Sequence, residues 1–463
     1  MYRNSVWQAF VRIAVNMKKK KNHHVWLVAV DMGYGHQRAT FPLQPLAYKK
    51  IITANNYKGI PESDRKIWQT SQSFYEFISR FSRVPVVGRA AFDLYDKFQA
   101  IPDFYPKRDL SRPSFQLKEI FHLIEGRQWG KHLIEQLNKD PHPLVTSFFS
   151  IAFMAEYFNY EGEIYCVICD ADIARVWADL KTPASRVNYF VPCYRVAERL
   201  KLYGVKPERI FLTGFPLPKE NLGGPKLNIL KHDLGHRLIN LDPLGRFRRR
   251  YGSTIQKQLG RKNLYARSNH PLTITFAVGG AGAQREIGAT ILKSLAKEIA
   301  GKKINLNLIA GIHEDIKDYF VRVTKEAGLA KSLDKQVKIL YTPDKNDYFK
   351  KFNKLLRTTD ILWTKPSELT FYSALGLPII MSPPIGSQEV FNKLWLKSIG
   401  SGIAQNDPRY TGEWLLDLVQ SGWLAQAAMR GFLEAPRLGT YNIERILARK
   451  PEEAQEIRNI IQY

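Results

Sequence analysis

The chain of 463 residues has few cysteines, few acidic residues and no long apolar run. Its three cysteines, Cys166, Cys169 and Cys193, are too few for a disulfide framework and suit a reducing compartment. Cys166 and Cys169 have a zinc-like Cys-x2-Cys spacing, but no second pair follows, so core cysteines are the favoured interpretation. No run of about 18 apolar residues occurs, which argues against a bilayer-spanning helix.

Acidic residues number 43 against 69 lysines and arginines, which gives a formal net charge of +26. This excess implies a polyanionic partner: an anionic membrane surface, nucleic acid or a phosphorylated ligand. Residues 1–24 have no acidic residue at all, and apolar residues such as Trp7 and Phe10 precede Lys18–Lys21 at helical spacing. A secretory signal has the opposite order of charge and apolar core. The segment fits an amphipathic helix on a membrane interface, or a helix packed on the protein body.

Short apolar runs separated by helical patterns are abundant. Their alternation predicts an α/β protein with parallel sheets and crossover helices, and the length predicts two domains. The expected strands are Val25–Val30, Leu144–Phe148, Ile164–Cys169, Val187–Val191, Ile210–Thr213, 272–278, Ile304–Ala310, Val337–Tyr341, Ile361–Thr364 and Ile379–Ser382.

Changes in composition divide the chain into five parts. We expect a basic amphipathic segment at 1–24 and a first domain at 25–218 with a helical insertion at 41–137. A basic interdomain segment at 219–268 and a second domain at 269–440 follow. In the C-terminal part, 441–463, we expect the helix Pro451–Tyr463 to cross back to the first domain. The insertion interleaves aromatic residues, from Trp68 to Tyr105, with basic ones. It is either an acceptor pocket that touches lipid headgroups or a helical subdomain with an aromatic core.

Two motifs of the second half can hold a nucleotide. The glycine loop Gly279–Gln284 opens a helix, and backbone N–H groups at such a helix start can bind phosphate. Lys365-Pro366-Ser367-Glu368 follows a strand, and a carboxylate there can accept hydrogen bonds from two ribose hydroxyls. The later polar loop with Gln388, Glu389 and Asn392 can hold a sugar.

Two motifs of the first half can act on an acceptor. Gly33-Tyr34-Gly35-His36 follows the first strand, and an imidazole with a pKa of about 6.5 makes His36 a candidate general base; the alternative is a loop histidine with structural hydrogen bonds. Arg38 is a candidate to hold an anionic acceptor group or phosphate. Asp170-Ala171-Asp172 mimics a metal-binding Asp-x-Asp, but the glycine loop already supplies diphosphate contacts, so no metal is expected.

These motifs, in this order, resemble those of the GT-B glycosyltransferases that include the monogalactosyldiacylglycerol synthases and the enzyme that adds N-acetylglucosamine to the peptidoglycan lipid intermediate. The segments from Val187 to Leu200 and from Gly204 to Pro216 resemble the family's sequence before its hinge. The resemblance implies two Rossmann-like domains facing a central cleft, a UDP-sugar donor in the second and a membrane lipid or lipid-linked acceptor in the first. It also makes Asp170 a second candidate base. With no second carboxylate identified for double displacement, we expect inversion by direct displacement.

The expected contacts follow from the resemblance and the motifs together. They are His36 and Asp170 for catalysis; Gly279, Gly280, Gly282, Ala283, Gln284, Tyr341, Ser367, Glu368, Gln388 and Glu389 for the donor; and Gly33, Gly35 and Arg38 for the acceptor. No cofactor is expected besides the UDP-sugar substrate. We expect a cytoplasmic protein, peripheral on the inner face of the membrane. The alternatives are a non-hydrolysing UDP-sugar 2-epimerase and a basic nucleic-acid-binding protein without catalysis, although no zinc finger, RNA-binding signature or helix-turn-helix stands out.

Overall fold

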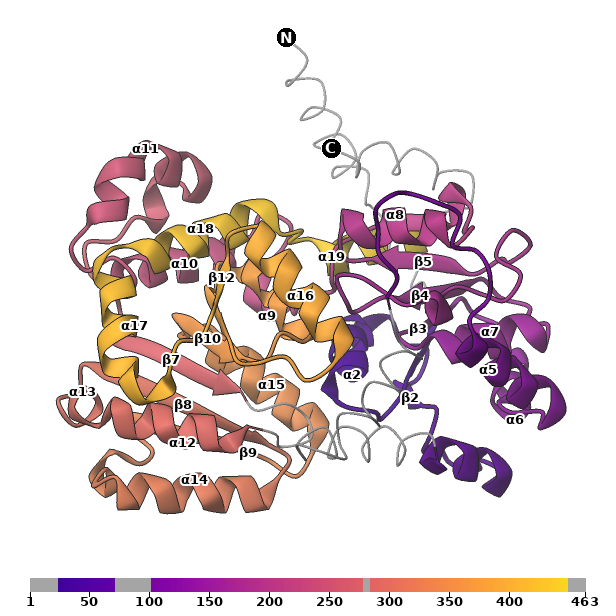
Figure 1. Ribbon diagram of the computed structural model, residues 1–463, viewed down its shortest axis with the longest axis horizontal. Helices are drawn as coiled ribbons and strands as arrows, with labels where there is room; N and C mark the ends of the chain where they lie inside the picture. The colour runs from indigo at the N-terminus through magenta and orange to yellow at the C-terminus, as the bar shows by residue number, and fades with distance from the viewer. Residues whose placement is uncertain (1–23, 71–100, 278–283, 449–463) are drawn as a thin grey trace, which may run out of the picture.

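The computed structural model describes residues 24–70, 101–277 and 284–448. These residues form two α/β domains side by side, the first drawn in indigo to magenta and the second in red to orange (Figure 1). Each domain contains a six-stranded sheet in which every pairing is parallel. The predicted GT-B architecture of two Rossmann-like domains is therefore confirmed.

The first sheet has the strand order β2-β1-β3-β4-β5-β6. From β1 the chain moves to β2 on one side and then to β3 on the other, so the order reverses between β1 and β3. Ligands of such sheets bind outside the carboxyl ends of the strands at this switch point. The strands are β1 (Trp26–Ala29), β2 (Ile52–Thr53), β3 (Leu144–Thr146), β4 (Ile164–Val167), β5 (Asn188–Val191) and β6 (Ile210–Leu212).

Except for β2, these strands are nearly all buried, because helices cover a parallel sheet on its faces. Leu27 and Val28 of β1 are fully buried, and burial of each such side chain contributes about 1.5–3 kcal/mol. The helices of this domain are α2 (Tyr34–Thr40), α5 (Phe115–Gly126), α6 (Lys131–Asn138), α7 (Phe149–Tyr157) and α8 (Tyr194–Leu202), with 3-10 turns η1 (Phe41–Leu46), η2 (Arg175–Trp177) and η3 (Pro207–Arg209).

The second sheet has the strand order β12-β11-β10-β7-β8-β9, so its switch point lies between β7 and β10. Its strands are β7 (Leu272–Ala277), β8 (Ile304–Gly311), β9 (Val337–Tyr341), β10 (Ile361–Thr364), β11 (Ile379–Met381) and β12 (Gly402–Ala404). Its helices are α12 (Arg285–Ser294), α13 (Ala296–Ala300), α14 (Glu314–Glu326), α15 (Lys345–Leu356), α16 (Ser387–Ser398), α17 (Thr411–Gln420) and α18 (Trp423–Glu434), with η5 (Ala330–Ser332), η6 (Glu368–Leu375) and η7 (Pro408–Tyr410).

The basic segment 219–268, expected between the domains, folds into helices packed on the second domain. They are α9 (Lys219–Leu222), α10 (Asn228–Asn240), α11 (Arg246–Leu259) and η4 (Arg261–Asn263). Buried Arg237 of α10 donates to the carbonyl oxygens of Thr359, at 2.7 Å, and Leu375, also at 2.7 Å. These bonds satisfy carbonyls left open where α15 and η6 have ended, and they tie α10 to the second sheet.

The chain passes between the domains twice, and the two connections touch. The first follows β6 through Gly214, and the second joins α18 to α19 (Gly439–Leu447). A Cβ on Gly214 would lie 2.6 Å from Pro436, and one on Gly439 would lie 2.1 Å from the Phe215 oxygen. Asn442 of α19 donates to the Thr213 carbonyl at 2.9 Å. The chain therefore returns to the first domain by residue 447, whereas the helix expected at 451–463 lies outside the described residues.

Other expectations also fall outside the described ranges. These are the N-terminal amphipathic segment, apart from its last residue, and the aromatic residues of the insertion between 71 and 100. Of the insertion's described aromatics, Trp68 is buried and its ring lies 4.7 Å from that of Trp129. Among the described helices, none has the length and apolar character needed to cross a membrane. The three cysteines are free and buried, as expected of core residues.

Candidate functional site

His36 lies at the switch point of the first sheet, on the helix that follows β1. Its Nδ1 lies 2.8 Å from the backbone oxygen of Ser147, the residue after β3, and the Ser147 hydroxyl donates to the His36 carbonyl at 2.8 Å. The two strand ends on either side of the switch point are thus tied together. The Phe148 and His36 rings pack edge to face at a centroid distance of 4.9 Å, which fixes the plane of the imidazole.

The Ser147 carbonyl decides which nitrogen of His36 carries the proton. A carbonyl oxygen only accepts, so Nδ1 is the donor in this contact and the neutral ring keeps its lone pair on Nε2. Burial lowers the pKa of His36 below its ordinary value, although the Ser147 contact and the charge of Glu368 oppose this change. A neutral imidazole with a free Nε2 lone pair is the form that a general base requires.

Asp170 lies beyond the end of β4, the next strand in the sheet. Burial is the main reason that its pKa is raised to about 6, and the charges of Glu368 and Glu389 add to the shift. A hydrogen bond from Asn392 Nδ2 at 2.9 Å opposes it. The Asn392 side chain also accepts from the Ala171 backbone at 2.7 Å. An amide of the second domain therefore holds the carboxylate of the first.

Glu368 is the first residue of η6, just past β10, and so lies at the switch point of the second sheet. Its position was predicted from the sequence. Its carboxylate is buried and accepts a hydrogen bond from Arg38 Nε at 3.0 Å. A Cβ on Gly35 would lie 3.3 Å from Glu368 Oε2, so the glycine leaves room beside that oxygen. The two switch points therefore meet at the Arg38–Glu368 pair.

Arg38 projects from α2 of the first domain into a group of rings in the second. Its guanidinium carbon lies 4.7 Å from the Phe352 ring centre and 5.1 Å from that of Phe349. Nη2 donates to the Tyr348 hydroxyl at 3.3 Å, whereas Nη1 is buried and has no hydrogen-bond partner among the described residues. Burial and these contacts hold Arg38 against Glu368 in this arrangement of the domains.

The remaining acceptor candidate, Gly33, is exposed and lies directly before α2. Its φ of 90° belongs to a region that favours glycine.

The donor loop is described only in part. Gly279, Gly280, Gly282 and Ala283 lie outside the described residues, but the last residue of the loop, Gln284, is placed. Its side chain accepts from the Ser382 hydroxyl at 2.7 Å and donates to the Pro383 oxygen at 2.9 Å. These contacts fasten the start of α12 to the loop after β11.

The sugar-loop candidates lie at the start of α16. Glu389 pairs with Lys365 and accepts from the Ile385 backbone at 2.7 Å. The side chain of Gln388 lies beside Gly386, because its Oε1 is 3.4 Å from the position that a Cβ on Gly386 would occupy. Glu389 therefore joins this loop to the residues preceding Glu368.

Two further donor candidates lie at strand ends. Ser367 immediately precedes η6, and its backbone N–H donates to the Lys365 oxygen at 2.8 Å, which forms the turn that presents Glu368. Tyr341 ends β9, where Lys317 Nζ lies 5.0 Å from its ring centre.

Asp172, the second carboxylate of the Asp-x-Asp sequence, is buried and bound by arginines. Arg199 Nε donates to it at 2.8 Å and Arg195 Nε at 2.9 Å. These guanidinium groups occupy both oxygens, so Asp172 ties α8 to the β4 loop. The arrangement favours a structural role over metal binding.

Sequence reasoning missed several residues that join the domains. Lys345 pairs with Asp31, and the Tyr34 hydroxyl accepts from the Ile312 backbone at 3.2 Å. The sequence does indicate that Tyr34 lies beside Arg38, because the two are four residues apart and share one face of α2. No pattern in the sequence indicates the partners, which lie about 300 residues away.

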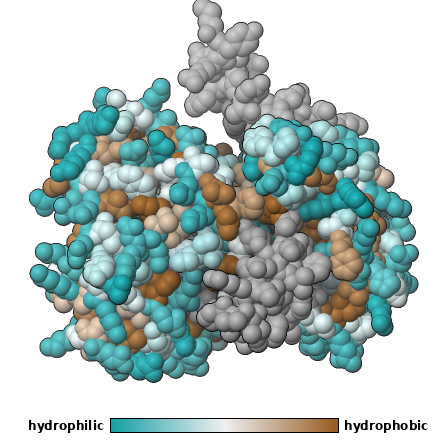
Figure 2. Space-filling model, in the orientation of Figure 1, coloured by the Kyte–Doolittle hydropathy of each residue, from teal (hydrophilic) through white to brown (hydrophobic). Residues whose placement is uncertain are grey.

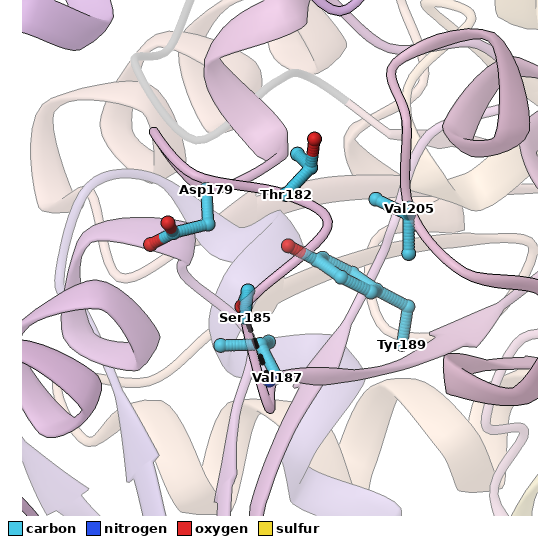
Figure 3. A pocket seen from close by; sticks show the side chains of 6 residues that line it. All are labelled: Asp179, Thr182, Ser185, Val187, Tyr189 and Val205. Atoms are coloured by element: carbon cyan, nitrogen blue, oxygen red, sulfur yellow. Dashed lines mark hydrogen bonds between the residues drawn. The ribbon is translucent and has the colours of Figure 1, made fainter.

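A separate small pocket lies in the first domain and contains none of the predicted site residues. Its lining is Asp179, Thr182, Ser185, Val187, Tyr189 and Val205 (Figure 3). The Ser185 hydroxyl accepts from the Val187 backbone at 3.2 Å there. Burial raises the pKa of Asp179 to about 6.

Comparisons with known proteins agree with the resemblance seen in the sequence. A processive diacylglycerol beta-glucosyltransferase of Bacillus pumilus (strain SAFR-032) is 20% identical over 396 residues, which are 83% of this chain and 84% of that protein. The protein of the same description from Bacillus subtilis (strain 168) is 20% identical over 394 residues, with the same coverage. The chain is thus a distant homologue of these glucosyltransferases.

A family model described as "Domain of unknown function (DUF6938)" matches residues 252–335 and 320–442. Among solved structures, Acinetobacter baumannii MurG has a TM-score of 0.43 at 13% identity, covering 95% of this chain and 99% of that one. A UDP co-structure of S. aureus MnaA has a TM-score of 0.45 at 12% identity, with coverage of 95% and 98%.

Proposed function

We propose that the chain is an inverting glycosyltransferase that moves a sugar from a UDP-sugar to a hydroxyl group of a membrane lipid or lipid-linked acceptor. One observation carries the proposal: the switch points of two parallel sheets meet, with His36 and Asp170 on one side and Glu368 on the other. The distant relationship to diacylglycerol glucosyltransferases supports the lipid acceptor.

The donor would lie against the second domain. Glu368 would accept hydrogen bonds from the ribose hydroxyls through Oε2, since Oε1 is bound by Arg38. The glycine loop before α12 would hold the diphosphate, where backbone N–H groups and the helix dipole stabilise the charge of the leaving group. Gln388, Glu389, Ser367 and Tyr341 would line the sugar and nucleotide.

The base would lie on the first domain. His36 Nε2 would take the proton of the acceptor hydroxyl as its oxygen attacks the anomeric carbon, and the bond from that carbon to the diphosphate oxygen would break. UDP leaves with the bonding electron pair, and the configuration at carbon inverts. Asp170, with its pKa raised to about 6, is the second candidate for the same step.

Gly33 and Gly35 would line the acceptor side. Arg38 would reach an anionic acceptor group only after leaving Glu368, so its first role in this arrangement is to hold that carboxylate. Apart from Nη1, its polar atoms face partners of the second domain.

UDP binding measured by titration calorimetry tests the donor site. We expect Glu368→Ala to weaken UDP binding by about 1.5–3 kcal/mol and Glu368→Gln to weaken it less, since the amide loses the charge but keeps an acceptor for the ribose hydroxyls. Glu314→Gln, at the exposed start of α14, is the matched control and should leave the affinity unchanged. Equal UDP affinity of a folded Glu368→Ala protein and the parent would contradict the assignment.

The acceptor and the location need a separate test. We propose peripheral association with the inner face of the membrane, through residues 1–21 and the interleaved aromatic and basic residues of the insertion at 41–137. Deleting residues 1–21 should reduce binding to anionic vesicles more than it reduces UDP affinity, because the lysine run acts through the surface charge of the lipid. Equal losses of vesicle binding and UDP affinity would point instead to misfolding of the truncated protein.

A further inference from the structure

The helices α11 and η4, with the residues flanking them, form a surface that has cations and no acidic residue. From 244 to 268 the chain has eight basic residues and neither aspartate nor glutamate. Arg248 is bound to Asp242, which precedes this stretch, whereas the other seven are exposed. We call these seven the basic face: Arg246, Arg249, Arg250, Lys257, Arg261, Lys262 and Arg267.

The position of the arginines on α11 works against the stability of that helix. Arg248 pairs with Asp242, whose carboxylate also accepts from the Phe247 and Arg248 backbone, but Arg246, Arg249 and Arg250 lie near the same N-terminus, and the first turn itself has no acidic residue. The N-terminus of a helix is the positive end of its dipole, where cations are unfavourable. These charges therefore do not serve the fold of the helix, and they point to a partner that is negatively charged.

Apolar side chains lie among the charges. Leu244 is 48% exposed, Leu264 42% and Tyr251 36%. A hollow of about 180 Å³ opens between α10 and α11, and Leu238, Ile239, Ile255, Leu259 and Leu264 are among its lining residues. Exposed leucines gain nothing from phosphates in water, but they gain free energy on entering hydrocarbon.

We propose that the basic face docks on an anionic lipid bilayer, with the arginines and lysines at the headgroups and Leu244, Tyr251 and Leu264 inserted between them. Nucleic acid would match the charge but not the exposed aliphatic side chains. The bilayer matches both features.

The location of the basic face suits a flat partner. Figure 1 shows α11 along the upper edge of the second domain and α8 along the upper edge of the first. Figure 2 shows hydrophilic residues with interspersed apolar ones over the α11 region. Tyr194, the first residue of α8, is 67% exposed, so this helix also presents an exposed aromatic residue. One bilayer would thus contact both domains.

The test compares vesicle binding of the full chain with that of an Arg246→Gln/Arg249→Gln/Arg250→Gln variant. Vesicles of phosphatidylcholine with phosphatidylglycerol are used in a flotation assay. Each basic residue near an anionic surface changes partitioning about fivefold, so three substitutions should weaken binding on the order of 100-fold. The variant should fold, because removing cations from a helix N-terminus is favourable.

A matched control removes three exposed lysines elsewhere on the second domain. Lys293→Gln/Lys297→Gln/Lys303→Gln alters α12, α13 and the turn before β8, near the lower edge in Figure 1. This control should keep its vesicle binding within a few-fold of the parent. Equal losses in both triple variants would overturn the proposal, since binding would then follow net charge alone.

The apolar residues separate a bilayer from nucleic acid. Leu244→Ser/Leu264→Ser should weaken vesicle binding several-fold and leave binding to a duplex oligonucleotide at the same ionic strength unchanged. Unaltered vesicle binding of both this variant and the arginine variant would refute docking by the basic face, and so would tighter binding of the parent to the oligonucleotide than to the vesicles. UDP affinity should be unchanged in every variant, so this result is independent of the proposed donor site.

Discussion

Removing one partner of the Arg38–Glu368 pair should expose how strongly the two domains are held together. The pair joins residues 330 positions apart, and the side chains are only 3% and 10% exposed. Glu368→Ala would leave the guanidinium buried among aromatic rings, and Nη1 already lacks a partner within the described part of the chain. Arg38→Met would keep an apolar side chain among those rings and remove the cation.

The expected magnitude follows from the burial. Removing one partner of a buried ion pair costs about 3–5 kcal/mol, because the other charge is left uncompensated. We expect Glu368→Ala to lie at the upper end of this range. The double variant Arg38→Met/Glu368→Ala should recover about 1–3 kcal/mol relative to the sum of the single changes, since neither charge then remains.

Urea unfolding of the four proteins measures this coupling. Because the pair lies between domains, part of the loss can take the form of domain opening, which small-angle scattering detects as a larger radius of gyration. A sum of the single effects that equals the double effect within about 0.5 kcal/mol, together with unchanged scattering, would refute a coupled interdomain pair.

Three further results are expected. His36→Ala should lower turnover about 10²–10⁴-fold while UDP still binds, and the same loss in Asp170→Asn alone would move the base to Asp170. If Asp170 is the base, kcat/KM should fall as the pH drops through about 6, where the carboxylate becomes protonated. Asn392→Ala should shift this fall in kcat/KM to higher pH, because it removes the hydrogen bond that favours the charged form of Asp170. A pH profile that does not shift in this variant would favour His36. Gly35→Ala should weaken UDP binding, because a Cβ would lie 3.3 Å from Glu368 Oε2, and an unchanged affinity would show that this oxygen does not face the ribose.

The sequence predicted ten of the twelve strands of the described residues, all but the short edge strands β2 and β12, because buried parallel strands are unbroken apolar runs. Val337–Tyr341 and Ile361–Thr364 match β9 and β10 at both ends, and the position of Glu368 after β10 follows from that match. Local patterns also placed His36 just after β1, although Tyr34–Thr40 forms helix α2 where the glycines suggested a loop. These features depend on neighbours in the chain, which a sequence displays directly.

The contacts of the site could not be predicted, because they join residues distant in sequence. Asp170 was identified as a candidate base, but its bond to Asn392 crosses 222 positions. The helices at 219–268 were obscured by their basic composition, which suggested only a segment between the domains. Their packing depends on Leu230, Leu234 and Leu238, spaced four residues apart, and this periodicity outweighed the charge.

The two touching connections between the domains constrain how the domains can move apart. A single linker would allow one domain to swivel and twist freely about the other. The two connecting segments contact each other at Gly214, Pro436 and Gly439, and together they form a two-segment hinge. Rotation about the line through them remains available, whereas twisting would pull the segments apart. A single proteolytic cut in one connection would leave the halves attached and would free that twist.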